Sequence, residues 1–131
     1  MATLLTLKNI RDSRGSLTIL DNLEKLLPFP VKRIFYIQKA CVARGGHRHH
    51  NTEHAVICLV GNCIVTVNDG KIEKSYLLNG PDQCLIIDTC DWHTMHHFSS
   101  DAILLAFAST VYDATDYIYV PYETVMANGT L

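Results

Sequence analysis

The feature that most constrains the fold is a series of short strand-like segments, which recur at roughly ten-residue intervals with no long helix between them. The segments fall at 17–20, 31–40, 54–60, 63–67, 71–78, 84–87, 92–98 and 102–108. Turn-forming residues separate them, and one short helix is expected at 21–27, capped by Asp21 and ended by Pro28. The pattern predicts an all-β sandwich or jelly roll, whose barrel mouth can bind a ligand.

Composition agrees with a single globular domain over residues 1–131 and narrows the functional classes. Hydrophobic residues make up 48% of the chain and charged residues 18%, which is not a disordered composition. The net charge is −2 and no basic block exists, which argues against a nucleic-acid partner. No signal-peptide pattern and no bilayer-length apolar run occur, so we expect no membrane partner and a cytoplasmic location.

The cysteines do not indicate a chemical site. Their number is odd, and no two have the CxxC spacing of zinc ribbons or dithiol redox centres. Cys58, Cys63 and Cys84 lie in predicted strands, so we interpret them as small buried residues.

The run Arg44-Gly45-Gly46-His47-Arg48-His49-His50 is the strongest candidate for a functional site. It forms a glycine–histidine loop directly ahead of the apolar strand at 54–60. Residues two apart on extended backbone point to one face, so His47 and His49 should aim their imidazoles at one point. Imidazole titrates near neutrality, and a convergent pair suits either proton transfer or metal binding.

Metal binding is the first alternative that the spacing raises. His47-x-His49-x3-Glu53, followed by His93, resembles the metal-binding pattern of cupins, which are jelly rolls. Nitrogen and oxygen ligands at such positions suit Fe, Mn, Ni or Zn. The remaining histidines are interpreted as surface or packing residues: His50, His54, His96 and His97.

Three arginines offer contacts to an anionic ligand. Arg14 lies in the first turn, Arg33 starts the strand at 31–40, and Arg44 opens the histidine run. Guanidinium groups bind phosphate oxygens well, although solvated surface positions are equally common for such residues. Tyr36 follows Arg33 on the same strand and is a candidate donor to a hydroxyl, with a core position as its alternative.

A set of motifs in one order along the chain resembles the dTDP-sugar 3,4-ketoisomerases of the FdtA type. The resemblance runs from about Ile10 to Ile118, nearly the whole chain. The motifs are Asp12-Ser13-Arg14-Gly15-Ser16-Leu17, Pro28-Phe29-Pro30-Val31-Lys32-Arg33-Ile34-Phe35-Tyr36-Ile37, Arg44-Gly45-Gly46-His47-Arg48-His49, Cys58-Leu59-Val60-Gly61-Asn62-Cys63, Asn68-Asp69-Gly70, Trp92-His93-Thr94-Met95-His96, Phe98-Ser99-Ser100-Asp101 and Tyr112-Asp113-Ala114-Thr115-Asp116-Tyr117-Ile118.

The resemblance implies a cupin-fold isomerase that acts on dTDP-4-keto-6-deoxyglucose in the synthesis of 3-amino sugars for bacterial surface glycans. It implies His47 as the base at C3 and His49 as the proton shuttle. Tyr36, His93, Arg14, Arg33 and Arg44 would contact the sugar or the pyrophosphate. It also implies catalysis without metal or cofactor. Two other classes stay open, namely a metal-dependent cupin enzyme and a non-catalytic cupin that binds sugar nucleotides.

The family resemblance carries two further expectations. Its members are usually dimers that exchange an N-terminal strand, here the apolar stretch from Leu4 to Ile10, whose edge needs cover. Members that make a galacto product carry Arg and His where this chain has Arg14 and His93. The expected product is therefore the 3-keto-6-deoxyhexose of galacto configuration at C4.

Overall fold

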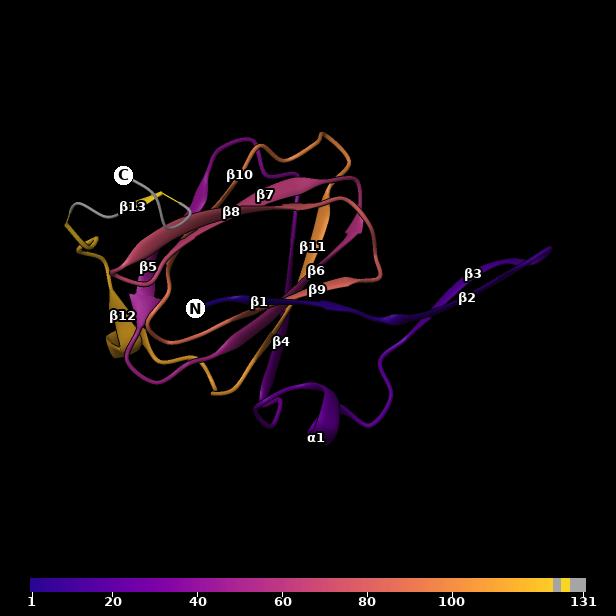
Figure 1. Cartoon of the computed structure of the whole chain (residues 1–131), viewed down its shortest axis with the longest axis horizontal. Coiled ribbons are helices and arrows are strands. Elements are labelled where there is room, and N and C mark those ends of the chain that lie inside the picture. Colours follow the sequence, from indigo (N-terminus) through magenta and orange to yellow (C-terminus); the bar gives the residue numbers. More distant parts are fainter. Residues whose placement is uncertain (124–125, 128–131) are drawn as a thin grey trace.

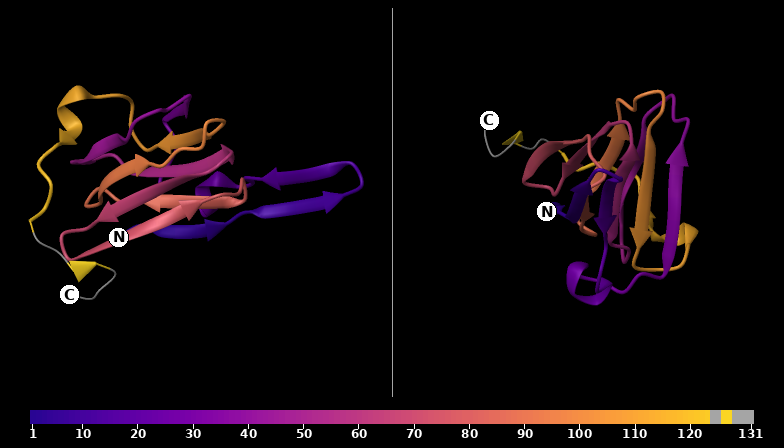
Figure 2. Two further views of the ribbon diagram at one scale, coloured as in Figure 1. Left: turned by 90° about the horizontal axis from the view of Figure 1, so that it is seen from above. Right: turned by 90° about the vertical axis from the view of Figure 1, so that its right-hand side faces the viewer.

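Two β-sheets pack face to face, and a hairpin projects from one end (Figures 1 and 2). The computed structural model describes residues 1–123 and 126–127. The first sheet has the spatial order β1 (Thr3–Thr6), β9 (Gln83–Ile87), β6 (His54–Val60), β11 (Ile103–Ala108) and β4 (Arg33–Gln38). The second has the order β12 (Tyr117–Ile118), β5 (Arg44–His49), β10 (Trp92–His96), β7 (Cys63–Asn68), β8 (Ile72–Leu78) and β13 (Met126–Ala127). Neighbouring strands among those described are antiparallel, except that β13 runs parallel to β8. This arrangement confirms the predicted all-β fold.

The main core lies between the two sheets because alternate side chains of each strand point inward. On β7, Val65 and Val67 are fully buried, while the residue between them is half-buried. Leu85 and Leu104 of the first sheet belong to the same buried cluster. The three cysteines expected in strands are buried free thiols: Cys58, Cys63 and Cys84.

A smaller buried cluster covers the outer face of the first sheet. Leu27 and Phe29, which follow the one-turn helix α1 (Leu23–Leu26), are almost fully buried in it. The helix has Asn22 as its N-cap, with a φ of 55° and no side-chain hydrogen bond to the helix. The expectation that Asp21 caps this helix was therefore wrong by one residue.

The N-terminal arm consists of two elements where the sequence suggested one strand. β1 pairs with β9 of the same chain, and the buried Leu7 then donates its amide to the carbonyl of Asp82 at 2.6 Å. Past this break, β2 (Lys8–Asp12) and β3 (Gly15–Ile19) pair only with each other among the described strands. They form the hairpin that extends beyond the sandwich in Figure 2.

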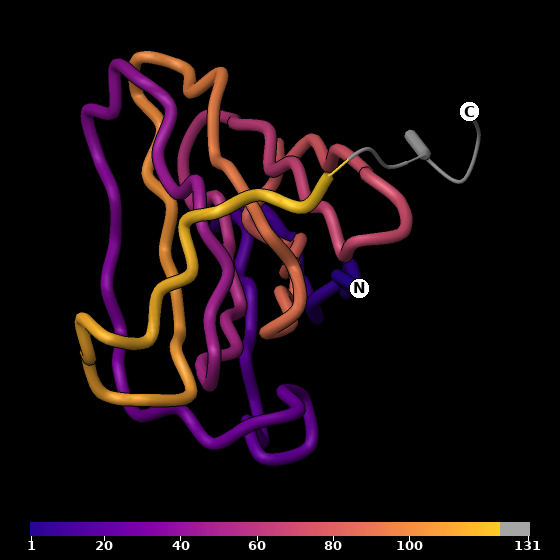
Figure 3. Tube along the Cα trace, turned by 90° about the vertical axis from the view of Figure 1, so that its left-hand side faces the viewer, coloured from indigo at the N-terminus to yellow at the C-terminus, as the bar shows by residue number. Residues whose placement is uncertain are grey.

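The segment after β11 folds back across the second sheet (Figure 3). A 3₁₀ turn, η1 (Ala114–Asp116), leads into β12, which pairs with β5. Further along, the Tyr122 hydroxyl donates to the carbonyl of Cys90 at 2.7 Å, and Trp92 Nε1 donates to the carbonyl of Tyr119 at 3.1 Å. This tyrosine-rich segment thus packs on the sandwich. Among residues 1–123 and 126–127, no helix has the length and apolar character needed to cross a membrane.

Candidate active site

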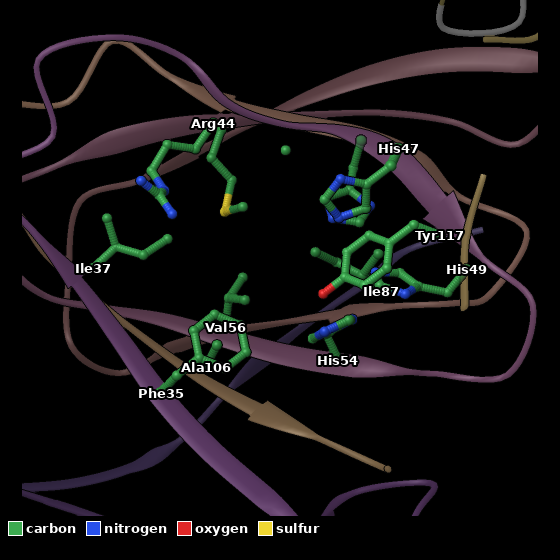
Figure 4. A pocket seen from close by; sticks show the side chains of 13 residues that line it. Phe35, Ile37, Arg44, His47, His49, His54, Val56, Ile87, Ala106 and Tyr117 are labelled. Atoms are coloured by element: carbon green, nitrogen blue, oxygen red, sulfur yellow. The ribbon is translucent and has the colours of Figure 1, made fainter. Parts of the chain in front are cut away.

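A cavity of about 580 Å³, its open mouth included, lies between the sheets where β4 and β6 face β5 and β10. Figure 4 shows two halves: Phe35, Val56 and Ala106 gather on one side, and His47, His49, His54 and Tyr117 on the other. Ile37, Arg44, Gly45, Ile87, His93 and Met95 complete the lining. An apolar wall opposite a few convergent polar groups is the usual form of a small-molecule site.

The predicted histidine run is a strand, β5, and a bulge within it sets which side chains face the cavity. His47 pairs with His93 of β10, but Gly45 pairs with the very next residue, Thr94, so Gly46 is an extra residue. This shift turns Arg44 to the same side as His47 and His49, although simple alternation would place it opposite. The prediction that the two histidines share a face is confirmed.

Gly45 allows β5 to approach β10 closely. Its φ is +86°, and a Cβ atom there would lie 2.8 Å from the carbonyl oxygen of His93. Both the backbone conformation and the space therefore favour glycine. The close approach holds the His47 and His93 rings with their centroids 5.1 Å apart.

His49 is held by Asp116, which comes from η1. His49 Nδ1 lies 2.9 Å from Asp116 Oδ2, and both side chains are buried. Asp116 also accepts hydrogen bonds from the Thr52 hydroxyl and, at 2.8 Å, from the Asn51 amide. Burial opposes ionisation, but these hydrogen bonds and His49 hold the pKa of the Asp116 carboxyl below its usual value. The carboxylate thus favours the Nδ1–H tautomer of His49.

The other ring nitrogen of His49 is left available for chemistry. Nε2 is buried and has no hydrogen-bond partner in the described part of the chain. Burial also keeps the imidazoles neutral: it lowers the pKa of His49, and it lowers the pKa of His47 to about 4, with His93 adding to the effect. A neutral imidazole has a free electron pair on one ring nitrogen, so His47 and His49 are in the protonation state that a base needs.

Three residues of the site were not predicted: His54 and Tyr117, which line the cavity, and Asp116, which holds His49. His54 was interpreted as a surface or packing residue; it is buried, but it lines the cavity. Strand alternation contained the signal, because His54 precedes the inward-facing Val56 by two positions. Asp116 and Tyr117 had no local signal, since they reach β5 from more than 65 positions away in the sequence.

Of the predicted arginines, the structure brings Arg44 and Arg33 to the site. Arg44 lines the cavity. Arg33 begins β4 with its guanidinium over the rings of Phe35 at 5.5 Å and Tyr112 at 5.8 Å. Its charge contributes to the lowered pKa of His49, after burial and the nearer groups. A positive charge therefore stands beside the imidazole half of the cavity.

Two predicted contact residues lie away from the cavity of this chain. Tyr36 is 66% exposed on the outer face of β4, because residues three apart on a regular strand, as Arg33 and Tyr36 are, point to opposite faces. Arg14 lies at the tip of the β2–β3 hairpin, where it pairs with Asp12 at 2.6 Å. Neither residue reaches the site within the single chain.

Three histidines have a geometry that fits a metal ion. His47, His49 and His93 each offer one ring nitrogen, and these atoms lie within 4.8 Å of one another. Asp116 and the carbonyl of Asp91 hold Nδ1 of His49 and of His93, an outer arrangement also found around metal-binding imidazoles. Glu53 is not in the group, so the predicted carboxylate ligand is not brought to it. The geometry suits both metal binding and proton transfer.

Comparison with known proteins agrees with the family that the sequence motifs resemble. The family model described as FdtA: WxcM-like, C-terminal, matches residues 1–127. A TDP-4-oxo-6-deoxy-alpha-D-glucose-3,4-oxoisomerase from Aneurinibacillus thermoaerophilus is 42% identical over 113 residues, which cover 85% of this chain and 81% of the relative.

Solved structures show the same similarity in three dimensions. The WlaRB TDP-quinovose 3,4-ketoisomerase from Campylobacter jejuni has a TM-score of 0.84 at 42% identity, over 91% of this chain and 92% of that one. A mutant of the 3,4-ketoisomerase QdtA from Thermoanaerobacterium thermosaccharolyticum, in complex with TDP-4-keto-6-deoxyglucose, has a TM-score of 0.85 at 34% identity. That match covers 91% of this chain and 87% of the other.

Proposed function

Because the chain belongs to the FdtA family and is a sugar 3,4-ketoisomerase, we propose that it converts dTDP-4-keto-6-deoxyglucose into the 3-keto-6-deoxyhexose of galacto configuration. The observation that carries the proposal is the pair of neutral, inward-facing imidazoles, His47 and His49, with ring centroids 4.9 Å apart in the cavity. The proposed role in surface-glycan synthesis, the cytoplasmic location and the single domain over residues 1–131 remain predictions.

The proposed reaction moves a carbonyl from C4 to C3 by proton transfers alone. His47 removes the proton from C3, and the C3–H electron pair forms a C3=C4 double bond while the C4 carbonyl oxygen becomes negative. A proton then passes from the C3 hydroxyl to the C4 oxygen through His49. Finally, protonated His47 gives its proton to C4, which returns His47 to the neutral form, and the electron pair of the C3 oxygen forms the C3 carbonyl. Positioned imidazoles are suited to each of these transfers near pH 7.

Asp116 is the positioning residue for this proposed shuttle. With the Asp116 carboxylate accepting from Nδ1–H, the free electron pair of His49 lies on Nε2, the nitrogen without a partner in the described residues. When Nε2 takes a proton, the carboxylate stabilises the imidazolium that forms. The fixed ring orientation also leaves one nitrogen only to face the substrate.

The substrate contacts are proposed from charge and position. The dTDP pyrophosphate carries negative charge, and Arg33 and Arg44 supply the positive charge at the cavity. His93 lines the sugar side, next to His47. Two mutually independent variants, Arg33→Ala and Arg44→Ala, should weaken TDP binding, and calorimetric titration with TDP measures this without turnover.

We infer a homodimer in which the hairpin, rather than β1, is the exchanged element. β4 is an edge strand of the first sheet, and its outward Ile34 and Tyr36 are 60% and 66% exposed. The hairpin carries exposed apolar side chains of its own, Ile10 and Leu17. A lone two-stranded hairpin is marginally stable in water. Docking on the β4 edge of a second copy covers both surfaces and places Tyr36 in the interface.

A subunit-mixing experiment tests whether Arg14 acts on the partner's site. Arg14→Ala and His47→Asn homodimers are mixed and allowed to exchange subunits. If Arg14 acts across the dimer, each mixed dimer contains one site with both residues intact, and the mixture gains activity over either parent. If Arg14 acts within its own subunit or not at all, mixing gives no gain.

The direct test of the function is incubation with dTDP-4-keto-6-deoxyglucose, followed by NMR of the product. A carbonyl at C3 is expected, and because C3 then carries no hydrogen, the H4–H5 coupling reads the configuration at C4. In the 3-amino sugar trapped by an aminotransferase, the H3–H4 coupling reads it as well. A large diaxial coupling would show the gluco epimer and contradict the galacto proposal, which rests on Arg14 and His93.

The two alternative classes predict other outcomes of the same assay. A metal-dependent cupin enzyme would be inactive after its metal is removed, and metal analysis of the purified protein would find stoichiometric metal. A non-catalytic binding protein would bind the sugar nucleotide through its arginines and give no turnover.

A further inference from the structure

His54 is a buried polar group at the site for which the proposed mechanism has no use. It begins β6 and is 6% exposed. Its ring lies in the cavity beside His49 and Tyr117 (Figure 4). Its Nδ1 is buried and has no hydrogen-bond partner among residues 1–123 and 126–127. A buried donor or acceptor without a partner is costly, so its presence in a ligand cavity points to a partner on the ligand.

The surroundings of His54 leave it neutral. The ring packs edge-on against Phe35 at 6.0 Å between centroids, and the His49 and His93 rings lie at 4.8 Å and 6.1 Å. Burial lowers its pKa to about 3, and the nearby His49, His93, Arg33 and His47 add to this. No carboxylate is among the groups that shift it. A neutral imidazole has one N–H to donate and does not readily give that proton up.

His54 lies beside the imidazole that is proposed to serve the two sugar oxygens. His49, the proposed shuttle between the two sugar oxygens, is the imidazole nearest to the His54 ring. A donor that stabilises the negative oxygen of an enediolate must lie close to that shuttle and must stay neutral, because it should donate without transferring its proton. His54 meets both requirements.

We propose that His54 hydrogen-bonds the sugar oxygen that becomes negative in the enediolate, as a neutral donor that takes no part in the proton transfers. The inference rests on the proposed 3,4-isomerisation and assigns a third imidazole to it. His47 and His49 move protons, and His54 stabilises the charge that their movement creates. Such donors act in a buried site that excludes water, where a hydrogen bond to an anion is strong.

Two substitutions distinguish the loss of the N–H donor from the loss of the imidazole ring's packing. His54→Leu removes the N–H and keeps an apolar group, whereas His54→Gln keeps an amide N–H donor. Loss of one preorganised donor typically lowers kcat by roughly 10²–10³-fold, and we expect His54→Leu to show this with little change in KM. His54→Gln should recover most of the loss. His50→Leu, at an exposed neighbouring histidine, is the matched control and should be unchanged.

Hydrogen exchange at C3 distinguishes a donor from a packing residue. In D₂O, substrate deuteration at C3 reports formation of the enediolate before turnover is complete. His54→Leu should slow this exchange by the same factor as kcat, because both depend on the stability of the enediolate. A folded His54→Leu protein, shown by its melting temperature and TDP affinity, with exchange and kcat within threefold of wild type would overturn the proposal.

A binding measurement keeps the inference separate from the proposed function. In His47→Asn protein, ¹⁵N NMR of the His54 ring is recorded with dTDP-4-keto-6-deoxyglucose and with TDP alone. The sugar nucleotide should shift one His54 nitrogen, and TDP should not. A wild-type enzyme that isomerises the substrate while the His54 nitrogens stay unshifted contradicts the inference only. A wild-type protein without turnover contradicts the proposed function itself.

Discussion

The cavity and the β2–β3 hairpin use their polar side chains in opposite ways. In the cavity, His49 and Asp116 are almost fully buried and hydrogen-bond each other across 67 positions of sequence. At the hairpin tip, Arg14 pairs with Asp12, two positions away, and its side chain is 88% exposed. The imidazole machinery is therefore assembled within one chain. In the hairpin, the charged and apolar side chains are exposed and can contact the surface of another chain.

This contrast assigns the two parts different tasks. A group that transfers protons needs a fixed geometry and a dry environment, which only the interior of the sandwich provides. A group that contacts a second chain must be exposed before assembly. Changes in the cavity should therefore affect the chemical step, and changes in the hairpin should affect assembly first.

The largest effect is expected at the imidazoles. His47→Asn and His49→Asn should each lower kcat by about 10²–10⁴-fold while the protein stays folded, because a general acid or base contributes about that much. Steady-state kinetics with dTDP-4-keto-6-deoxyglucose measure the loss, and circular dichroism checks the fold. Near-normal turnover in either variant would show that the assigned role is wrong.

Asp116→Asn should sharpen the assignment of the shuttle. The amide keeps the shape but loses the charge that stabilises the His49 imidazolium, and residues that orient a functional imidazole typically affect activity by about 10–100-fold. Kinetics should show a lower kcat with KM nearly constant. Asp113→Asn is the control, because Asp113 is exposed and hydrogen-bonds the amide of Thr115 rather than His49. Equal losses in both variants would indicate a general effect on η1.

In the hairpin, Leu17→Asp should break the dimer and leave the imidazole site intact. A charge on this exposed apolar side chain opposes burial against a second copy. Light scattering at micromolar concentration should show monomer, with Leu77→Asp on β8 as a control that stays dimeric.

If Arg14 contacts the partner's substrate, the KM of the Leu17→Asp protein should rise by roughly tenfold or more, since hydrogen bonds to charged groups contribute about 1.5–3 kcal/mol. If the wild-type protein is itself a monomer, the hairpin does not serve assembly and the contrast between hairpin and cavity is wrong.

The buried histidines of the cavity should also make the protein sensitive to acid. The pKa values of His47 and His93 are lowered to about 4, and that of His54 to about 3, mainly by burial. Unfolding returns each to about 6.5, so the unfolded chain binds more protons below that pH. The free energy of unfolding should have its full value above pH 6.5. It should fall as the pH drops towards 3–4, by up to about 1.4 kcal/mol per pH unit for each group.

Urea unfolding measured across pH 4–8 tests this dependence. His54→Gln should make the acid slope shallower, because it removes one of the three groups. The exposed His50→Gln should leave the slope unchanged. Equal slopes in wild type and His54→Gln would mean that His54 titrates normally in the folded protein.

The smallest effect is expected from chelation. Proton transfer by imidazoles needs no Lewis acid, so activity should survive prolonged treatment with EDTA. Loss of activity that one divalent ion restores would instead favour a metal on His47, His49 and His93.

Much of the fold could be predicted from local patterns. The strand at 54–60 coincides with β6 (His54–Val60), and the helix and most turns fell within a few residues of their places. Two elements could not be predicted in this way. Leu7 turns inward and divides the N-terminal arm, and Gly46 adds a bulge to β5. Both depend on the hydrogen-bond pairing with a strand that is distant in the sequence, and a local sequence pattern does not contain that pairing.

The candidate site divides along the same line. Alternation placed His47 and His49 on one face because only their shared strand matters for that prediction. Tyr36 was assigned to the sugar pocket together with Arg33, yet both faces of β4 carry apolar residues, and the sequence does not say which one turns inward. Tyr36 faces outward in the structure.

By itself, the sequence determined the strands, the turns and the convergence of two imidazoles, because these follow from side-chain direction along a few residues of backbone. The tertiary structure alone decided that Asp116 holds His49, that His54 joins the cavity and that Arg14 stands away from it. The physical reason is that pairing between distant strands brings together residues tens of positions apart. Only that pairing determines which polar groups lose water and must find partners in the site.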